Sequence, residues 1–432
     1  MSLKKYLKQI RVGFFILLYI EPFSAYAKSE VLILNDVVKE AISSHPQVLE
    51  IQNKAKAAKN VPSRAGSLPD PMLQLTAQNF RTDDFSSDSS PMSALGIGLV
   101  QNIPFPGKLA RRSRIAKSKS KTISETVRLT KALVIHNLKR AYWHLHFTEK
   151  AYEITQENLK IIDVLADVAI NRIKVAKVAQ QDAFQAQVAH SKLRAEIIQR
   201  RESLLNAKRD LNRAIGRNPE EKIGRTQELS TSDLKLASKT LSANMRKESP
   251  YLKVADLKVN QSEKILAEAK YDRFPDLKFG VNYKLRDPVL GDQTDGADMV
   301  TATIGISIPI WMGRKQNARV SENINKLLAS KEQQRDVDLQ VGTRLGTLHE
   351  KIMRLNGEIN LYKKEVLPRA NKALDASITD YKRAKVGFVS VVSNWNTELD
   401  LQINFEKLLK DRAIAESEIE LVTGTSLRRL NL

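Results

Sequence analysis

Apolar residues recur along this chain with two different periods, and each period predicts a different kind of element. Between residues 276 and 308 the period is two, so that apolar side chains alternate with polar or small ones in two runs of about ten residues. A weaker alternation occupies residues 73–77 and 95–99. We therefore expect four β-strands in two pairs, each strand with one apolar face.

Elsewhere the apolar spacing is helical. Residues 35–66 are expected to form a helix with a kink or restart at Pro46. From Gly107 to about Ala176 apolar residues recur every seventh position, which is the a/d pattern of a coiled coil. A helix of about 65 residues is roughly 100 Å long, because each residue adds 1.5 Å. Such an element is built to span a distance. A second helix is expected over residues 183–214, with an apolar face formed by Phe184, Val188, Ala195, Ile198 and Leu205.

The chain carries the same landmarks twice, roughly 205 residues apart. Leu-Pro-Asp-Pro at 68–71 is matched by Phe-Pro-Asp-Leu at 274–277, and Ile-Pro-Phe-Pro-Gly-Lys at 103–108 by Ile-Pro-Ile-Trp-Met-Gly-Arg at 308–314. The order is the same both times, which indicates an internal duplication. We expect a first repeat over residues 28–225, a connector over 226–246 and a second repeat over 247–432, each repeat made of a helix, a strand pair and a long helical hairpin.

Residues 1–27 have the pattern of an export signal, with a basic start, a short apolar run and Ala25-Tyr26-Ala27 as a cleavage site. The chain has no cysteine, which excludes disulfides, thiolate metal sites and an N-terminal lipid anchor on cysteine. After the signal, the sequence has no run of about 20 apolar residues, the length that a membrane-spanning helix needs. A membrane-bound mature chain would therefore span the bilayer with strands.

The four expected strands have the length of tilted strands that cross a bilayer, although a half-buried soluble sheet is the ordinary alternative. Four strands cannot close a barrel by themselves, since the smallest membrane barrels have about eight. Several chains would have to contribute. The edges of such a sheet must be paired by neighbouring copies.

The formal net charge of +21 does not by itself indicate a nucleic-acid partner, because the basic residues are interleaved with acidic ones along the helical stretches. No catalytic constellation is visible and no cofactor is expected. His144 and His146 lie two positions apart on a helix, so they point in different directions and cannot share a metal ion. We expect no metal site.

Taken in order, these features resemble the TolC-like outer-membrane efflux family over essentially the whole chain after the signal. The segment from Ala176 to Gln187 resembles the helical-hairpin turn of that family, in which a small residue is followed by Asp182 and then by an Ala-Gln pair. The segments at 68–71 and 103–108 resemble those that flank the strands in the heavy-metal-exporter branch, of CzcC and CusC type. The order, spacing and duplication carry the resemblance together.

The resemblance implies a mainly α protein with a membrane β-barrel. Each chain of a homotrimer would give four strands to a twelve-stranded barrel in outer-membrane lipid and its helices to a hollow coiled-coil tube across the periplasm. It further implies a passive exit duct in the outer membrane of a Gram-negative bacterium. The duct would work with a periplasmic adaptor and an inner-membrane efflux pump of the RND type, and it would conduct metal cations.

The resemblance also implies two groups of site residues. The periplasmic tip, which closes the tube and meets the adaptor, would include Asp182, Ser393 and Asn396 at the constriction and Ala176, Val178 and Gly387 in the docking turn. Ser393 and Asn396 stand where the family usually has acidic residues, so a cation-favouring ring is in doubt. The transition from barrel to tube would include Pro104, Pro309 and Trp311, since a proline ends a strand ladder.

Other functions remain open at this point. A periplasmic adaptor or coiled-coil structural protein would have one helical hairpin per chain, whereas this chain has two. A duct for type I protein secretion would share the whole architecture and differ only in cargo. An enzyme is the least favoured alternative, since no acid–base or nucleophile pattern is present.

Overall fold

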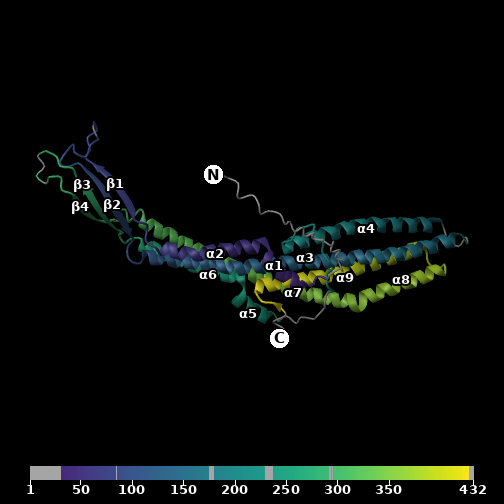
Figure 1. Cartoon of the computed structure of the whole chain (residues 1–432). Helices are drawn as coiled ribbons and strands as arrows, with labels where there is room; N and C mark the ends of the chain where they lie inside the picture. Colours follow the sequence, from purple (N-terminus) through teal and green to yellow (C-terminus); the bar gives the residue numbers. More distant parts are fainter. Residues whose placement is uncertain are drawn as a thin grey trace, which may run out of the picture.

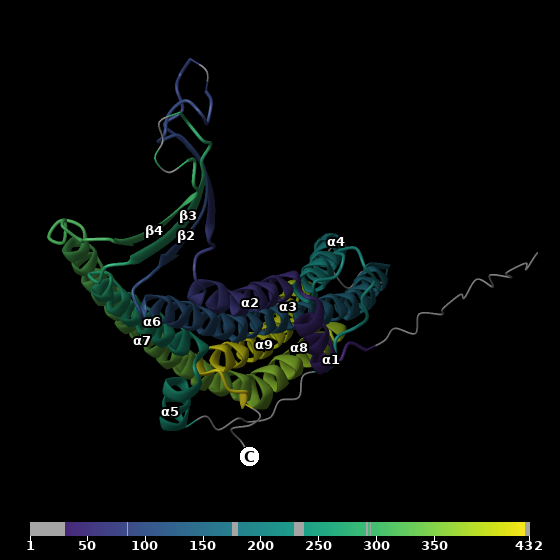
Figure 2. The same cartoon turned by 60° about the vertical axis from the view of Figure 1, so that its left-hand side comes forward.

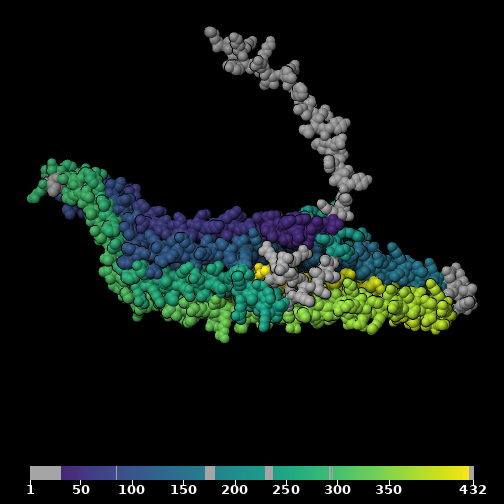
Figure 3. All heavy atoms as spheres, turned by 90° about the horizontal axis from the view of Figure 1, so that it is seen from below, coloured from purple at the N-terminus to yellow at the C-terminus, as the bar shows by residue number. Residues whose placement is uncertain are grey.

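The computed structural model describes residues 31–83, 85–174, 180–228, 237–290, 293 and 295–427, with the backbone alone for residues 171–174 and 180. The expected export signal lies outside the described residues. The molecule is a long rod of helices with a sheet at one end (Figure 1). Seen as spheres, the helices pack side by side into a continuous rod (Figure 3).

The order of elements repeats once along the chain. The first set is α1 (Leu34–Ser44), α2 (Pro46–Gly66), β1 (Met72–Gln78), β2 (Ala94–Ile103), α3 (Lys108–Lys174) and α4 (Gln180–Ile215). The second set is α5 (Ser238–Glu248), α6 (Pro250–Tyr271), β3 (Leu277–Leu285), β4 (Met299–Ile306), α7 (Gln316–Leu361), the π-helical turn η1 (Tyr362–Val366), α8 (Leu367–Lys382) and α9 (Phe388–Thr423). Helix α5 crosses the expected border between the connector and the second repeat, so the exact repeat boundaries stay a prediction.

The four strands form one antiparallel sheet in the order β1-β2-β3-β4. Leu99 of β2 lies opposite Leu73 of β1 and Val281 of β3, so that apolar residues share one face, and these three side chains are exposed in the single chain. Strand β4 ends at Ile306, two residues earlier than the alternation predicts. Asp276 closes the strand pair there, since its N–H donates to Ser307 Oγ over 2.7 Å and its C=O accepts from the Ser307 N–H over 2.8 Å.

The shorter helices stack end to end, which the sequence did not reveal. Gly216 follows α4 with a φ of +97°, and a Cβ added there would lie 3.0 Å from the Cα of His45, just before α2. Gly424 follows α9 with a φ of +71°, and its Cβ would lie 2.3 Å from the carbonyl oxygen of Glu248, just before α6. Only glycine fits both positions. The α4–α2 stack lies along α3, and the α9–α6 stack contacts α7 and α8.

The long helices bury much of the expected a/d seam. In α3, Leu138, Leu145 and Ile162 are fully buried. In α7 the buried a/d residues are Leu345, Leu348, Ile352, Leu355 and Ile359. The helix expected over residues 183–214 is confirmed as α4, but the apolar residues that mark it in the sequence, Phe184, Val188, Ala195, Ile198 and Leu205, are all exposed in the single chain. A second stripe, which includes Ala183, Ala186, Ala189, Leu193 and Leu211, is buried instead. Small alanine side chains allow close approach to α3.

The two long hairpins differ in one respect. Helix α3 runs through 67 residues with no proline, whereas the second long helix is interrupted by η1 just before Pro368. Proline lacks an N–H and its ring clashes with the preceding helical turn. The wider π-helical turn relieves this clash. In η1 the Leu367 N–H bonds to the Tyr362 carbonyl oxygen.

Candidate functional site

The tip of the rod, at the end away from the sheet, is held by a core that both hairpins share (Figure 1). Tyr381 of α8 is fully buried, and its ring meets Phe388 edge-on with centroids 5.4 Å apart. Its hydroxyl donates to Asp182 Oδ2 of α4 over 3.4 Å. Trp395 of α9 donates from Nε1 to Asn158 Oδ1 of α3 over 2.7 Å. These two contacts connect the first hairpin to the second.

Ser393 and Asn396 lie on α9, one helical turn apart, and both are exposed. Asn396 lines an apolar groove of about 710 Å³ between α4 and α9, together with Phe184 and Val188. Asp182 is not among the residues that line it. Ser393 is not among them either, so this groove holds one of the three expected constriction residues.

Of the expected docking turn, Ala176 and Val178 lie outside the described residues. Gly387 is the N-cap of α9, with an extended backbone and nothing within 4 Å of an added Cβ. Beside it the turn between α8 and α9 exposes three basic residues, Lys382, Arg383 and Lys385. This described turn of the tip is therefore basic and open.

Acidic side chains inside the tip and the rod were missed by sequence reasoning. Glu398 of α9 is 6% exposed and accepts a hydrogen bond from Gln402. Burial raises the pKa of Glu398, the hydrogen bond lowers it by less, and nearby Asp375 of α8 raises it further. Burial likewise raises the pKa of Glu416. The place of both glutamates among the apolar residues of α9 is the sequence signal that could have indicated their burial.

Where the sheet meets the helices, the chain forms a tight joint that we call the closed joint: Phe105, Gly107, Lys108, Tyr271, Phe274 and Asp276. Lys108, whose side chain is 5% exposed, donates from Nζ to Asp276 Oδ1 over 2.8 Å and to the Phe274 carbonyl oxygen over 2.7 Å. The Phe105 N–H donates to the same Oδ1 over 2.8 Å. Burial raises the pKa of Asp276, but the hydrogen bonds from Lys108 and from the Phe105 N–H outweigh it, so the net pKa is lowered.

Aromatic rings complete the closed joint. Phe105 stacks on Phe274 with centroids 4.7 Å apart, and Tyr271 donates to the Pro106 carbonyl oxygen over 3.1 Å. Gly107 has a φ of +93°, and a Cβ there would lie 3.2 Å from the Tyr271 hydroxyl oxygen and 3.3 Å from its ring carbon Cε1. The β2–α3 connection is thereby fixed against the α6–β3 connection.

The three residues expected at the transition lie in the connections from sheet to helix. Pro104 directly follows β2, while Pro309 follows β4 after two residues. Trp311 is 66% exposed in the β4–α7 connection. The closed joint itself was not identified from the sequence, although the repeated Pro-Asp and Gly-basic pairs were the signal that could have found it.

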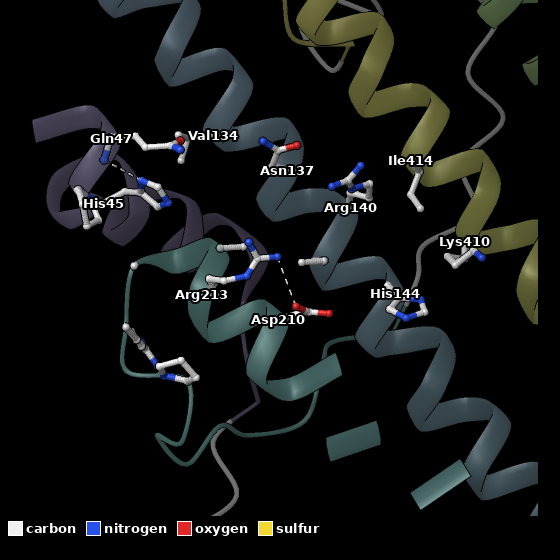
Figure 4. Close-up of a pocket in the computed structure, with 16 residues that line it drawn as sticks. His45, Gln47, Val134, Asn137, Arg140, His144, Asp210, Arg213, Lys410 and Ile414 are labelled. Atoms are coloured by element: carbon white, nitrogen blue, oxygen red, sulfur yellow. Dashed lines mark hydrogen bonds and ion pairs between the residues drawn. The ribbon is translucent and has the colours of Figure 1, made fainter. Parts of the chain in front are cut away.

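A basic cavity of about 750 Å³ lies beside the α4–α2 stack, between α3 and α9 (Figure 4). Its lining includes Arg140, Arg213 and Lys410. His45 lines it too and accepts the Gln47 N–H at Nδ1 over 3.2 Å, which caps α2. Burial lowers the pKa of His45. Asp210, 3.4 Å from Arg213, lines the same cavity and offsets part of its charge.

The histidines are separated as their spacing predicts. His144 lines the cavity, whereas His146 pairs at Nδ1 with the Thr226 hydroxyl over 2.8 Å. Among the described residues, no group of three or more His, Cys, Asp or Glu side chains is placed to hold a metal ion. Within the same residues, no helix is long and apolar enough to cross a membrane.

Comparison with known families decides what kind of protein this is. The model of the family described as outer membrane efflux protein matches residues 37–217 and 241–425, which is most of the chain. The chain belongs to the outer membrane efflux protein family. No curated protein sequence matches it significantly.

Several solved structures of membrane proteins share the fold. The chain is similar to CusC (14% identity, TM-score 0.77, covering 91% of this chain and 92% of that one). It is also similar to the outer membrane protein VceC of Vibrio cholerae (15%, 0.75, 91% and 96%) and to the open state of the MtrE outer membrane channel of Neisseria gonorrhoeae (14%, 0.75, 91% and 89%).

These comparisons confirm the coarse expectations from the sequence. The chain is a mainly helical member of the outer membrane efflux protein family, with a four-stranded antiparallel sheet and a TolC-like channel fold.

Proposed function

We propose that this protein is the outer-membrane exit duct of a tripartite efflux system. The observation that carries the proposal is the pairing of a four-stranded sheet, apolar and exposed on one face, with a helical rod that contains a 67-residue helix. At 1.5 Å per residue that helix alone is about 100 Å long. The sheet would sit in outer-membrane lipid and the rod would extend through the periplasm.

The assembly we propose is a homotrimer. Among the described residues, no further strand pairs with either edge of the sheet, β1 or β4. Unpaired backbone groups are not tolerated in a bilayer, so copies must pair edge to edge and close a barrel. Three copies would give twelve strands. The exposed apolar stripe of α4 supports packing between copies as well.

The duct would pass cargo without chemistry of its own, between a periplasmic adaptor at the tip and an inner-membrane pump of the RND type. We propose metal cations as cargo, because the segments at 68–71 and 103–108 resemble those of heavy-metal exporters. Drugs and secreted polypeptides are the competing cargos. Deleting the gene and measuring growth in a panel of metals and antibiotics separates these cargos, since only the transported class becomes more toxic.

Membrane insertion is tested by one substitution and its matched control. Ile304→Asp places a charge on the exposed apolar face of β4, where a lipid-facing charge costs up to a few kcal/mol. Thr303→Asp places the same charge on the opposite face of the same strand. We expect Ile304→Asp alone to reduce the amount of protein in carbonate-extracted outer membranes. Wild-type protein found as a soluble periplasmic monomer would contradict the duct.

A further inference from the structure

The duplication places the same joint twice in the chain, yet only one copy of the joint is filled. In the closed joint, the β2–α3 connection packs on the α6–β3 connection that neighbours it in the sheet. The equivalent of the β2–α3 connection is the β4–α7 connection. The equivalent of the α6–β3 connection is the α2–β1 connection. These two lie at opposite edges of the sheet and are here called the open halves.

The landmarks assign partners within the open halves. Asp70 follows Pro69 as Asp276 follows Pro275, and Arg314 follows Gly313 as Lys108 follows Gly107. Asp276 and Lys108 form a hydrogen-bonded ion pair, whereas Asp70 and Arg314 are both exposed. Neither of these two makes a hydrogen bond or ion pair with any described residue. Each open half carries the charge that the other lacks.

The apolar side chains of the β4–α7 connection are exposed as well. Ile310 is 72% exposed, whereas Phe105, which also follows an Ile-Pro pair, is stacked in the closed joint. An added Cβ at Gly313 would meet nothing within 4 Å, while one at Gly107 would press on Tyr271. Figure 2 shows the β4–α7 connection standing clear of the other elements.

Residue sizes in the open halves are reversed relative to the closed joint. The position equivalent to Tyr271 is Ala65, and the one equivalent to Phe274 is Leu68. The β4–α7 connection, in turn, carries Trp311 where the β2–α3 connection has smaller residues. The β4–α7 connection therefore has larger side chains than its equivalent, and the α2–β1 connection has smaller ones. This complementarity is expected of two surfaces that fill one joint.

We propose that the open halves of two copies of this chain form a second joint, in which Arg314 of one copy pairs with Asp70 of the partner subunit. The surface is an interface and its occupant is a second copy. The proposal rests on the assembly of several copies proposed above, and it goes beyond that assembly by naming the contact that fixes how neighbouring copies meet.

The same symmetry gives the strand register between copies. The β1–β2 and β3–β4 hairpins have the same register, since Leu73 pairs with Leu99 and the equivalent residues Phe279 and Ile304 pair with each other. In the β2–β3 pair, Gln101 lies opposite Phe279. The equivalent positions are Ile306 of β4 and Leu73 of the partner subunit. Both are exposed apolar residues, so this register continues the apolar face across the edge.

Cysteine cross-linking of the full chain in isolated outer membranes tests the joint, because the chain has no cysteine of its own. The variant Asp70→Cys/Arg314→Cys, treated with mild oxidant or a short bifunctional maleimide, is expected to run mainly as covalent multimers on a denaturing gel. The control Lys108→Cys/Asp276→Cys is expected to stay at the mass of one chain, because its joint is internal. Asp70→Cys alone should give no multimer.

The register is tested with a pair shifted by one residue. Ile306→Cys with Leu73→Cys is expected to cross-link at least five times more than Ile306→Cys with Gln74→Cys, whose second thiol lies on the other face of β1. Equal cross-linking of the two pairs would overturn the register.

Charge reversal provides a measurement that needs no thiol chemistry. Arg314→Asp and Asp70→Arg should each lower the temperature at which the multimer dissociates in detergent, and the double reversal should restore at least half of the loss. A wild-type multimer whose Asp70→Cys/Arg314→Cys variant stays at the mass of one chain, or a double reversal that restores nothing, would sink the joint and leave the duct standing. A wild-type protein that is monomeric in the outer membrane would remove both.

Discussion

The ammonium nitrogen of Lys108 lies 2.8 Å from Oδ1 of Asp276, although 168 positions separate the two residues. The lysine is almost fully buried, whereas the side chain of the aspartate is 43% exposed. The pair therefore connects the two repeats at the point where sheet becomes helix. Removing the aspartate would leave a buried charge unpaired, whereas removing the lysine would leave a charge that water reaches.

Removing Asp276 is expected to cost more stability than removing Lys108. Asp276→Ala leaves a buried ammonium group without its partner and the Phe105 N–H without an acceptor, which costs about 2–4 kcal/mol. Lys108→Met removes the buried charge and leaves a carboxylate that water reaches, so about 1–2 kcal/mol is expected. Thermal unfolding of the purified variants measures the order, and a Lys108→Met loss as large as that of Asp276→Ala would contradict it.

The pH dependence follows from the lowered pKa of Asp276. A carboxyl whose pKa is lower in the folded state stabilises the fold above its unfolded pKa of about 4, and this contribution is lost as pH falls through the folded pKa. The difference in melting temperature between wild type and Asp276→Asn should therefore be constant from pH 7 to 5 and shrink below about pH 4. A constant difference down to pH 3 would show that the charge is not what Asp276 contributes.

Substitutions at the helix stacks test a backbone effect. Gly216→Ala and Gly424→Ala force a Cβ into the left-handed region, which costs about 1–2 kcal/mol before any clash. Gly424→Ala is expected to be the worse, because its Cβ would lie 2.3 Å from a carbonyl oxygen. Gly357→Ala is the control: it lies inside α7 with open space around it and should be neutral or stabilising by up to about 1 kcal/mol. Chemical unfolding of the three variants compares them.

His45 makes the α2 cap sensitive to acid. Its Nδ1 accepts the Gln47 N–H, which protonation of that nitrogen prevents, and burial lowers the pKa of His45. Since the unfolded state then binds the proton more readily, stability is present above about pH 6.5 and falls as pH drops through the folded pKa. His45→Asn retains a capping oxygen but does not titrate. Between pH 7 and 5, wild type should lose more stability than this variant, and parallel curves would exclude the cap as the cause.

The tip prediction concerns ion selectivity. Ser393 and Asn396 are neutral and exposed, and the turn between α8 and α9 is basic. If these two residues line the constriction of the assembled channel, Ser393→Asp/Asn396→Asp adds two carboxylates per chain in a narrow, weakly screened space. Reversal potentials in a salt gradient should then shift toward cations, with stronger block by divalent metals. Unchanged potentials would place both residues away from the pore.

Sequence patterns predicted the elements well where one periodicity dominates. The alternation around Leu277 and the seven-residue spacing around Leu138 each follow from the way one face of a strand or helix is buried. The helix predicted over residues 183–214 is confirmed as α4, but it has two apolar stripes. The sequence alone cannot say that the smaller alanine stripe packs inside the chain while Phe184 stays exposed.

The candidate sites show a similar division. Pro104 and Pro309 lie between a strand and a helix, where a proline can end a strand ladder, and their role at a transition from barrel to tube stays a prediction. The Lys108–Asp276 pair was missed, since it depends on β2 lying beside β3, which follows from topology and not from local pattern. Ala176 and Val178 lie outside the described residues, so their docking role stays a prediction.

The π-helical turn before Pro368 makes the two hairpins mechanically unequal. Helix α3 is a continuous α-helix over its 67 residues, whereas the helix formed by α7 and α8 is interrupted by the π-helical turn at Tyr362–Val366. A hydrogen bond from Asn404 of α9 to the Tyr362 hydroxyl, 2.7 Å long, braces that section from the side. A force that bends the tip would therefore bend the second hairpin at η1, before the tip itself is reached. The first hairpin would stay straight, because α3 has no such interruption.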